Sequence, residues 1–363
     1  MSLEVGIVGL PNVGKSTLYS AITSAPAEAA NYPFCTIEPN MGIVSVPDER
    51  IDRLVEIVQP KKTQHNALKL IDIAGLVKGA STGEGLGNKF LGHIRAVDAI
   101  AHLVRCFEDE NITHVEGRIS PLDDVELINT ELVLADLEQV DKKLEKLKRM
   151  SKGNKELQAQ IPFVERLLAH LEEGTMATSF EVTEDEEPLM EEMQLITRKP
   201  YFYVGNVSED GLLEDPEEFK ALAERAEKEG VHCIKICCKL EAELAEMEDA
   251  ERTEFLEEMG VKISGLGKLI QVGFKLLKQI TFFTAGVQEV RAWNVFEGAK
   301  APEAAGKIHS DIERGFIRAE VYHFDDADQF GSEAQVKDAG RLRTEGKEYL
   351  VKDGDIMHFR FNV

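Results

Sequence analysis

Residues Gly9 to Ser16, written GLPNVGKS, carry the strongest chemical signal in this sequence of 363 residues. They match the pattern GxxxxGK[ST], follow the apolar run EVGIVGL and lead into a helical stretch. Glycine lets a backbone curl so closely that its N–H groups converge on phosphate oxygens at a helix N-terminus. Lys15 then neutralises charge on the β- and γ-phosphates, and the Ser16 hydroxyl is a ligand for Mg²⁺. The pattern predicts a nucleoside triphosphate site with contacts from Asn12, Val13, Gly14, Lys15, Ser16 and Thr17.

Two further elements have the order and spacing of a nucleotide switch. Thr36 follows the first helical stretch, and Asp72 begins the run Asp-Ile-Ala-Gly that ends at Gly75 after an apolar strand. In switch NTPases such a threonine closes over Mg²⁺, the aspartate holds the ion through water, and the glycine N–H senses the γ-phosphate. The glycine-rich run 79–87 behind them is too flexible to hold one conformation unaided. It is either a plain linker or a switch ordered by γ-phosphate, and its position favours the switch.

The residues Asn206-Val207-Ser208-Glu209 stand where guanine-specific relatives carry NKxD. In NKxD the aspartate accepts from guanine N1–H and N2–H₂, whereas adenine has a bare acceptor at N1 and no 2-amino group. A glutamate is longer and is expected to turn outward to solvent, while the Asn206 amide can pair with adenine N6 and N7. We therefore expect ATP to be preferred over GTP, with Asn206 and the backbone or side chain of Val207 against the base. The alternative is that both nucleotides bind.

The residue after the Asp-Ile-Ala-Gly run is Leu76, where many relatives carry a glutamine that orients the attacking water. Intrinsic hydrolysis should therefore be slow unless another group positions water. Histidine can orient or deprotonate water near neutral pH, and His114, His93 and His102 are the candidates, each with a purely structural role as the alternative. We favour His114, because its loop follows a strand whose C-terminal end should face the nucleotide. The expected catalytic residues are thus His114 and Lys15.

The composition, 43% apolar and 30% charged, is that of a globular protein rather than a membrane protein. No apolar run of membrane-spanning length and no signal peptide is apparent, so we expect a cytoplasmic chain with no membrane partner. A formal net charge of −24 argues against indiscriminate coating of nucleic acid, and we expect no sequence-specific DNA partner. The cysteines have no zinc spacing and are expected to be buried reduced thiols, with Cys35 the one exception worth testing.

The order of the predicted elements indicates an α/β fold. Short apolar runs alternate with helical stretches over residues 1–122 and 198–278, which predicts a doubly wound, mostly parallel sheet of the P-loop NTPase type. Residues 123–197 read as an inserted coiled-coil hairpin, because two apolar stripes flank the turn at Lys152–Asn154. The stripes are Val133, Leu137, Val140, Leu144 and Leu147, then Leu157, Ile161, Val164, Leu168 and Leu171.

Basic residues gather towards the tip of this predicted hairpin in a chain that is otherwise acidic. They are Lys142, Lys143, Lys146, Lys148, Arg149, Lys152 and Lys155. They indicate either a solvated helix face or a contact with a polyanion. The remaining residues, 279–363, combine hairpin-like alternation, a helical stretch and two strands, which predicts a small α+β domain.

The sequence resembles the YchF-type Obg-like ATPases from residue 3 to its last residue. The resemblance is carried by GLPNVGKST, NYPFCTIEPN, DIAGLVKGAS, GEGLGNKFL, FTAGVQEVRAW, KIHSDIERGFIRAEV and DGDIMHFRFN. It implies a P-loop domain of the Obg class, a helical hairpin insertion, and a C-terminal TGS domain, a β-grasp module associated with RNA or ribosome contact. It also implies a preference for ATP and suggests that Asn12 ligates a K⁺ ion bridging the phosphates, where a simple loop cap is the alternative.

Three hypotheses for function follow. The first is a slow, Mg²⁺-dependent ATPase whose nucleotide state changes the surfaces presented to the ribosome, its RNA being contacted by the TGS domain and the basic hairpin tip. The second is a GTPase translation factor, which the residues at 206–209 disfavour. The third is a ribosome-binding adaptor in which hydrolysis is incidental and ATP stabilises the fold.

Overall fold

The computed structural model describes residues 3–24, 40–73, 86–109, 112, 118–261 and 263–362. The chain divides into two compact units, one formed by Leu3–Ile43 with Lys69–Leu269 and the other by Val44–Leu68 with Ile270–Val363. Several residues singled out above lie outside the described ranges: Cys35, Thr36, Gly75, Leu76, His114 and the run 79–85. Within those ranges, no helix has the length and apolar character needed to cross a membrane.

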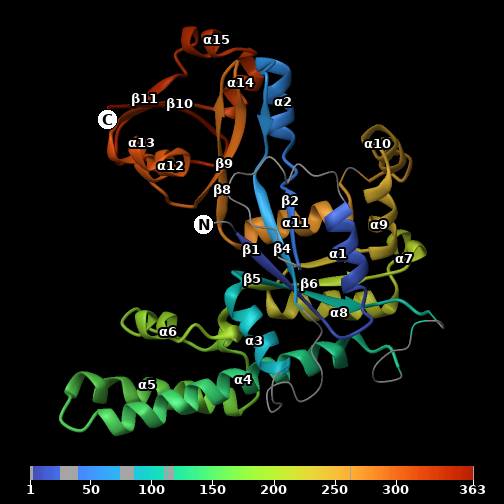
Figure 1. Ribbon diagram of the computed structural model, residues 1–363, viewed down its shortest axis with the longest axis vertical. Coiled ribbons are helices and arrows are strands. Elements are labelled where there is room, and N and C mark those ends of the chain that lie inside the picture. Colours follow the sequence, from blue (N-terminus) through green and yellow to red (C-terminus); the bar gives the residue numbers. More distant parts are fainter. Residues whose placement is uncertain are drawn as a thin grey trace. The chain divides into compact units, whose positions relative to one another are not determined.

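The first unit is built on a mostly parallel sheet (Figure 1). Among the described residues its strands lie in the spatial order β2 (Met41–Ser45), β4 (Ala67–Asp72), β1 (Glu4–Val8), β5 (Ala99–Arg105), β6 (Tyr201–Asn206) and β7 (Cys233–Ile236). Parallel pairing joins β1 to β4 and β5, β5 to β6, and β6 to β7. Every residue of β5 is buried, as a central strand covered on both faces requires. The predicted α/β class is confirmed.

Helices cover both faces of this sheet. On one face, Val125 of α4 (Pro121–Met150) and Phe219 and Leu222 of α8 (Glu217–Glu229) pack against Val104 and Tyr203 of the central strands. On the other face, α1 (Lys15–Ser24) packs along α9 (Cys238–Glu246) (Figure 1). The unit also contains α3 (Leu86–Ala96), α7 (Glu209–Leu213), α10 (Asp249–Glu258) and the start of α11 (Gly265–Leu276). In a doubly wound sheet, the loops that bind ligands lie at the carboxyl ends of the strands.

The predicted hairpin consists of α4 and α5 (Lys155–Glu172), which pack along each other (Figure 1). On α4 the expected stripe is buried except for Leu137, which is half-buried. On α5 the expectation is only partly right, because Phe163 and Leu167 are buried although the predicted stripe omits both. Leu157, Ile161 and Leu168 lie at the edge of the cluster instead. The buried face of α5 is therefore wider than a two-helix seam.

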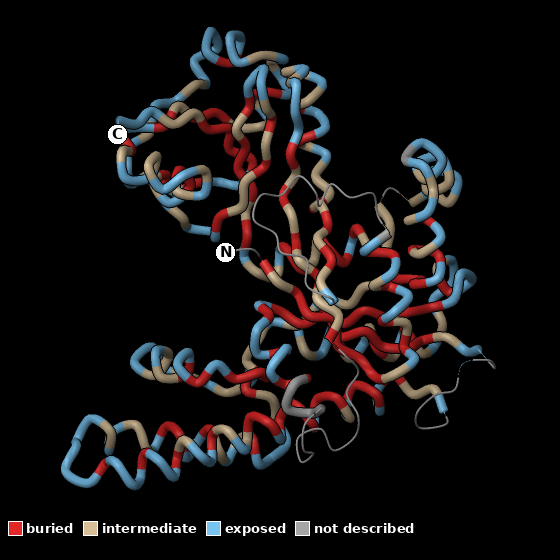
Figure 2. The backbone as a smooth tube through the Cα atoms, in the orientation of Figure 1, coloured by how far each residue is buried: buried red, intermediate tan, exposed pale blue. Residues whose placement is uncertain are grey.

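A third segment explains the wider face. It comprises η2 (Ala177–Ser179), α6 (Glu187–Met193) and η3 (Ile196–Arg198), and it packs Met190, Met193 and Leu195 on the hairpin. The buried Asp136 carboxylate of α4 accepts hydrogen bonds from the backbone N–H groups of Ile196 and Thr197, at 3.0 and 2.8 Å. The two bonds attach η3 to α4. They also satisfy the Asp136 carboxylate, which would be costly to bury without hydrogen bonds. Figure 2 shows exposure increasing towards the turn between α4 and α5.

The second unit contains a mixed sheet. Its described strands lie in the order β11 (Arg343–Glu345), β10 (Phe316–His323), β12 (Asp355–Phe361), β8 (Gln279–Ala285), β9 (Val290–Phe296) and β3 (Thr63–Gln64). The first and last strands of the C-terminal segment, β8 and β12, are parallel neighbours, and β8 forms an antiparallel hairpin with β9. This is the predicted β-grasp arrangement. Besides α2 and the end of α11, its described helices are α12 (Ala301–Ile308), α13 (Ser310–Arg314), α14 (Phe324–Phe330) and α15 (Glu333–Asp338).

Residues 44–68 belong to this second unit, although the sequence analysis placed them with the nucleotide-binding region. Helix α2 (Glu49–Val58) buries Ile51 and Leu54 in the same cluster as Phe283 and Tyr322. Strand β3 pairs in parallel with β9. Helix α2 has one apolar face, and the partners of that face lie more than two hundred residues away in the sequence.

Candidate nucleotide-binding site

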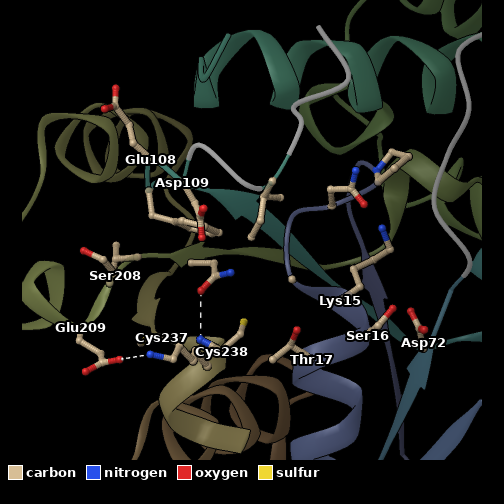
Figure 3. Close-up of a pocket in the computed structure, with 18 residues that line it drawn as sticks. Lys15, Ser16, Thr17, Asp72, Glu108, Asp109, Ser208, Glu209, Cys237 and Cys238 are labelled. Atoms are coloured by element: carbon tan, nitrogen blue, oxygen red, sulfur yellow. Dashed lines mark hydrogen bonds and ion pairs between the residues drawn. The ribbon is translucent and has the colours of Figure 1, made fainter. Parts of the chain in front are cut away.

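A cavity of about 940 Å³ lies at the carboxyl edge of the parallel sheet (Figure 3). The end of β4 and the segments that follow β1, β5, β6 and β7 line it. The lining residues are Pro11, Asn12, Gly14, Lys15, Ser16, Thr17, Asp72, Phe107, Glu108, Asp109, Ile112, Asn206, Val207, Ser208, Glu209, Cys237, Cys238 and Lys239. The sheet thus collects the described phosphate-loop and base-loop candidates in one place, apart from the buried Val13, whose carbonyl reaches Asn206.

The phosphate loop contains left-handed backbone conformations, which glycine adopts without strain and asparagine adopts more readily than most residues. Asn12 and Gly14 both have positive φ angles, 63° and 107°. A Cβ atom on Gly9 would lie 2.4 Å from the Leu103 carbonyl oxygen, and one on Gly14 would lie 2.4 Å from Asn206 Nδ2. The glycines of the motif are therefore needed both for the curl of the loop and for its packing onto neighbouring strands.

Lys15 lies in the first turn of α1 and is largely buried. Its ammonium group donates hydrogen bonds to the carbonyl oxygens of Gly9, at 2.8 Å, and Leu10, at 2.6 Å. Burial lowers the pKa of Lys15 to about 8, and the nearby Asp72 carboxylate opposes that shift. The loop thus holds a buried cation at its centre, where a phosphate group would be its natural counter-charge.

Ser16 and Asp72 provide oxygen ligands beside this cation. Ser16 is exposed to the cavity, and Figure 3 shows the Asp72 side chain next to it. Asp72 Oδ1 is buried and has no hydrogen-bond partner in the part of the chain that the structure describes. Burial raises the pKa of Asp72, and Lys15 opposes the shift. A hydroxyl and an unpartnered carboxylate oxygen fit a hard, oxygen-seeking cation such as Mg²⁺.

Asn206 connects three loops. Its Nδ2 donates to the Val13 carbonyl oxygen at 2.9 Å, and its Oδ1 accepts from the Cys238 backbone N–H at 3.0 Å. Only 4% of the residue is exposed. Each polar end of the amide is thus engaged with the protein and keeps one further hydrogen-bonding site, so the bidentate pairing with adenine stays a prediction. The side chain braces the phosphate loop against the start of α9.

The other residues of the base loop differ in part from expectation. Val207 is buried, and its backbone N–H donates to the Ile236 carbonyl oxygen at 2.8 Å. Glu209 is exposed, as expected, but its carboxylate does not simply point into solvent. It forms an ion pair with the Lys239 ammonium at 2.8 Å, drawn as a dashed line in Figure 3. Lys239 lies in the first turn of α9, just after β7.

Arg105 is a functional candidate that the sequence analysis missed. It ends β5 and is only 1% exposed. Its guanidinium group donates to the carbonyl oxygens of Phe107, Asp109 and Ile112, at 3.1, 3.3 and 3.0 Å, and lies 4.6 Å from the centre of the Phe107 ring. One buried cation thus shapes the loop that forms a wall of the cavity. The signal in the sequence is an arginine inside the otherwise apolar strand AIAHLVRCF.

The histidine candidates separate by position. His102 is buried in β5, its ring centre lies 5.6 Å from that of Tyr203, and burial lowers its pKa to about 3. It is therefore a neutral core residue and does not position water. His93 lies on the exposed side of α3, and His114 is outside the described ranges. Cys106, Cys237 and Cys238 are buried, as expected for structural thiols.

We predict that Arg105→Lys loosens the part of the cavity wall formed by residues 107–109 and Ile112. Lysine keeps the positive charge but cannot span three separate carbonyl oxygens, and each lost hydrogen bond contributes about 1 kcal/mol. Hydrogen exchange of amides in this loop should accelerate by about tenfold or more, while amides of β1 and β6 keep their rates. The matched substitution Arg314→Lys, on an exposed helix of the second unit, should change neither. Unchanged loop exchange in Arg105→Lys would contradict this role.

Comparisons with known proteins agree with this architecture. Residues 4–150 match a family described as the 50S ribosome-binding GTPase, and residues 279–362 match the YchF GTPase C-terminal family, which is described as a protein of unknown function. A Bacillus subtilis protein named ribosome-binding ATPase YchF is 53% identical, and one of the same name from Escherichia coli O157:H7 is 50% identical. Each alignment covers 100% of both chains.

A solved structure leads to the same assignment. The YchF GTPase of Schizosaccharomyces pombe is 39% identical and superimposes with a TM-score of 0.89, covering 99% of this chain and 98% of that one. The likeness spans the P-loop unit, the helical hairpin and the β-grasp unit alike. On the strength of its sequence, its site and its fold, the chain belongs to the YchF family of P-loop proteins.

Proposed function

We propose that this protein is a Mg²⁺-dependent, slowly hydrolysing ATPase that acts as a nucleotide-state switch and associates with the ribosome in the cytoplasm. The carrying observation is the cavity in which Lys15, Ser16 and Asp72 converge beneath a curled phosphate loop. Relatives about half identical over their full length bear the name ribosome-binding ATPase, which supports both halves of the proposal. A GTPase factor or a ribosome-binding adaptor with incidental hydrolysis are the rival functions.

The chain's own groups can bind the triphosphate without large rearrangement. The Lys15 ammonium group exchanges its two loop carbonyls for β- and γ-phosphate oxygens, while the N–H groups of the loop and the N-terminus of α1 face the same charge. Val13, Gly14 and Thr17 supply the remaining loop contacts in this proposal. Gly75, outside the described ranges, is assigned the sensing of γ-phosphate. The adenine ring is assigned to the pocket wall beside Val207 and Asn206.

When bound, Mg²⁺ would neutralise the negative charge that develops on the phosphates. Ser16 is proposed as its direct ligand, Asp72 as its partner through water, and Thr36 as the switch residue that closes over it. Asn12 is proposed as a ligand of K⁺: it lines the cavity, and its amide oxygen is a suitable ligand. Hydrolysis at equal rates in K⁺ and Na⁺ would count against that assignment.

We predict that Asp72→Asn raises the Mg²⁺ concentration needed for half-maximal ATP binding. Loss of a group that holds a metal through water typically lowers metal affinity by about tenfold to a hundredfold. Calorimetric titration of ATP at a series of Mg²⁺ concentrations measures this without relying on turnover. The control Asp98→Asn lies at the opposite end of β5, where the carboxylate accepts from the Glu4 backbone N–H, and should leave the Mg²⁺ dependence unchanged.

The pKa of Lys15 makes ATP affinity dependent on pH. Because burial lowers this pKa to about 8, the nucleotide-free protein loses the cation as pH rises through that value. Bound triphosphate favours the charged form, so binding at higher pH must take up a proton. We expect the Kd for ATP to rise about tenfold from about pH 7 to about pH 9, with proton uptake visible in calorimetry. A Kd for ATP that stays constant between these pH values would contradict the proposed contact between the Lys15 ammonium group and the triphosphate.

Ribosome contact is assigned to the TGS domain, residues 279–363, and to the basic tip of the hairpin insertion, residues 123–197. At the tip, Lys142, Lys143 and Lys148 form ion pairs with Glu138, Glu192 and Glu165. By contrast, Lys146, Lys152 and Lys155 have no ion pair within the described part of the chain. Arg149 has no ion pair there either, and its guanidinium donates to the Glu145 carbonyl oxygen at 3.3 Å. These four cations are therefore the part of the tip available to RNA phosphates.

We predict that sedimentation with ribosomes differs between nucleotide-free, ATP-bound and analogue-bound protein. A switch must bind its partner with different affinity in its different states. Equal binding in all three conditions would favour the adaptor function. Replacing Lys146, Lys152 and Lys155 together by serine should weaken sedimentation and reduce its salt dependence.

The matched control for the tip replaces Lys142, Lys143 and Lys148 together by serine, which removes the same number of ammonium groups, all of which already have carboxylate partners. This control should have a smaller effect on sedimentation. If both sets weaken ribosome binding equally, net charge rather than the unpaired tip is responsible.

A further inference from the structure

The ion pair between Glu209 and Lys239 is the feature of the cavity for which the proposed function has no use. Glu209 follows β6, Lys239 lies in the first turn of α9, and both line the cavity (Figure 3). Their charged atoms are 2.8 Å apart, and Glu243 is a more distant second partner of Lys239, at 3.8 Å. The bond to Glu209 is also the largest cause of a raised pKa at Lys239.

The ion pair between Glu209 and Lys239 contributes little to the stability of the folded protein. The Glu209 and Lys239 side chains are 54% and 72% exposed, and ion pairs between such exposed groups contribute little to stability. Lysine is moreover unfavourable near the N-terminus of a helix, where the helix dipole places positive charge. Neither helix electrostatics nor burial thus favours the pair, while both of its residues line the cavity, where they can affect what binds.

The position of the carboxylate gives that effect a direction. A carboxylate at the end of this loop is the group that accepts from guanine N1–H and N2–H₂ in guanine-specific relatives, as the sequence analysis set out. Here the carboxylate at that position is held by an ammonium group from the facing loop. A carboxylate has about four acceptor sites, so the constraint is one of position. The ion pair holds the Glu209 carboxylate beside α9, and pairing both of its oxygens with a guanine edge would require it to move from Lys239.

We propose that Lys239 is a specificity-determining residue, which selects against guanine by holding the Glu209 carboxylate at the rim of the cavity. The inference rests on the proposed ATP preference and extends it. Discrimination comes from a contact within the protein that withholds an acceptor, in addition to any contact made to adenine. The longer glutamate side chain makes this possible, because it reaches across to α9 where an aspartate is one methylene shorter.

The test compares ATP and GTP affinities, by titration in Mg²⁺, for the parent protein, Lys239→Met, Glu209→Gln and the double variant. Lys239→Met frees the carboxylate, and the ratio of ATP to GTP affinity should fall by about tenfold, the lower end of what one paired base contact discriminates. Glu209→Gln should leave the ratio near that of the parent. The double variant should lose the gain in GTP binding, because the freed acceptor is then absent.

The matched control is Lys220→Met, which removes an exposed lysine paired with Glu217 on α8 and should leave both affinities unchanged. Both lysines are exposed, so unfolding is not expected, and a thermal melt confirms it. An unchanged ratio in Lys239→Met, or a GTP gain that survives in the double variant, overturns the role of Lys239 while the ATPase proposal stands. A parent protein that binds GTP as tightly as ATP overturns the proposed ATP preference itself.

Discussion

The nucleotide cavity depends on the two hydrogen bonds made by the Asn206 amide. One reaches Val13 in the phosphate loop and the other reaches Cys238 at the start of α9, so a single side chain fixes three loops relative to one another. Gly14 lacks a Cβ at the point where that amide passes. Because these segments are distant in the sequence, the cavity can exist only once β1, β5, β6 and β7 have paired in that order. Loop geometry at the site is thus a property of the assembled sheet.

Backbone carbonyl oxygens around the cavity serve as hydrogen-bond partners of buried cations. Lys15 and Arg105 are both largely buried, and each donates to carbonyls of the loop that it shapes. Such bonds hold a charge in place at less cost than burying it alone. They also explain how a chain with a formal net charge of −24 can present a locally positive site to a polyanion. The two cations differ in what they can bind. Lys15 lines the cavity and can exchange its carbonyl partners for phosphate oxygens, whereas Arg105 is fully buried and keeps its carbonyl partners.

Sequence reasoning succeeded where the rules are local. The phosphate loop, the parallel sheet and the hairpin follow from spacing within windows of about ten to thirty residues. It fell short where a residue's partner is remote. The contacts of the Asn206 amide with Val13 and Cys238 could not be foreseen, because nothing in its sequence neighbourhood reveals either partner. Phe163 and Leu167 were overlooked because the segment that buries them returns after the hairpin. Thr36, Gly75 and His114 remain predictions from the sequence alone.

The inclusion of residues 44–68 in the second unit has a consequence for modularity. A gene fragment encoding only residues 270–363 would lack α2, and would leave Phe283 and Tyr322 without Ile51 and Leu54 against them. It would also lack β3, the edge partner of β9. The C-terminal unit is therefore not a cassette that recombination could move intact to another protein. The segment that the C-terminal unit needs, residues 44–68, lies between the two predicted switch residues, Thr36 and Asp72. The two units therefore have to be inherited together in one gene.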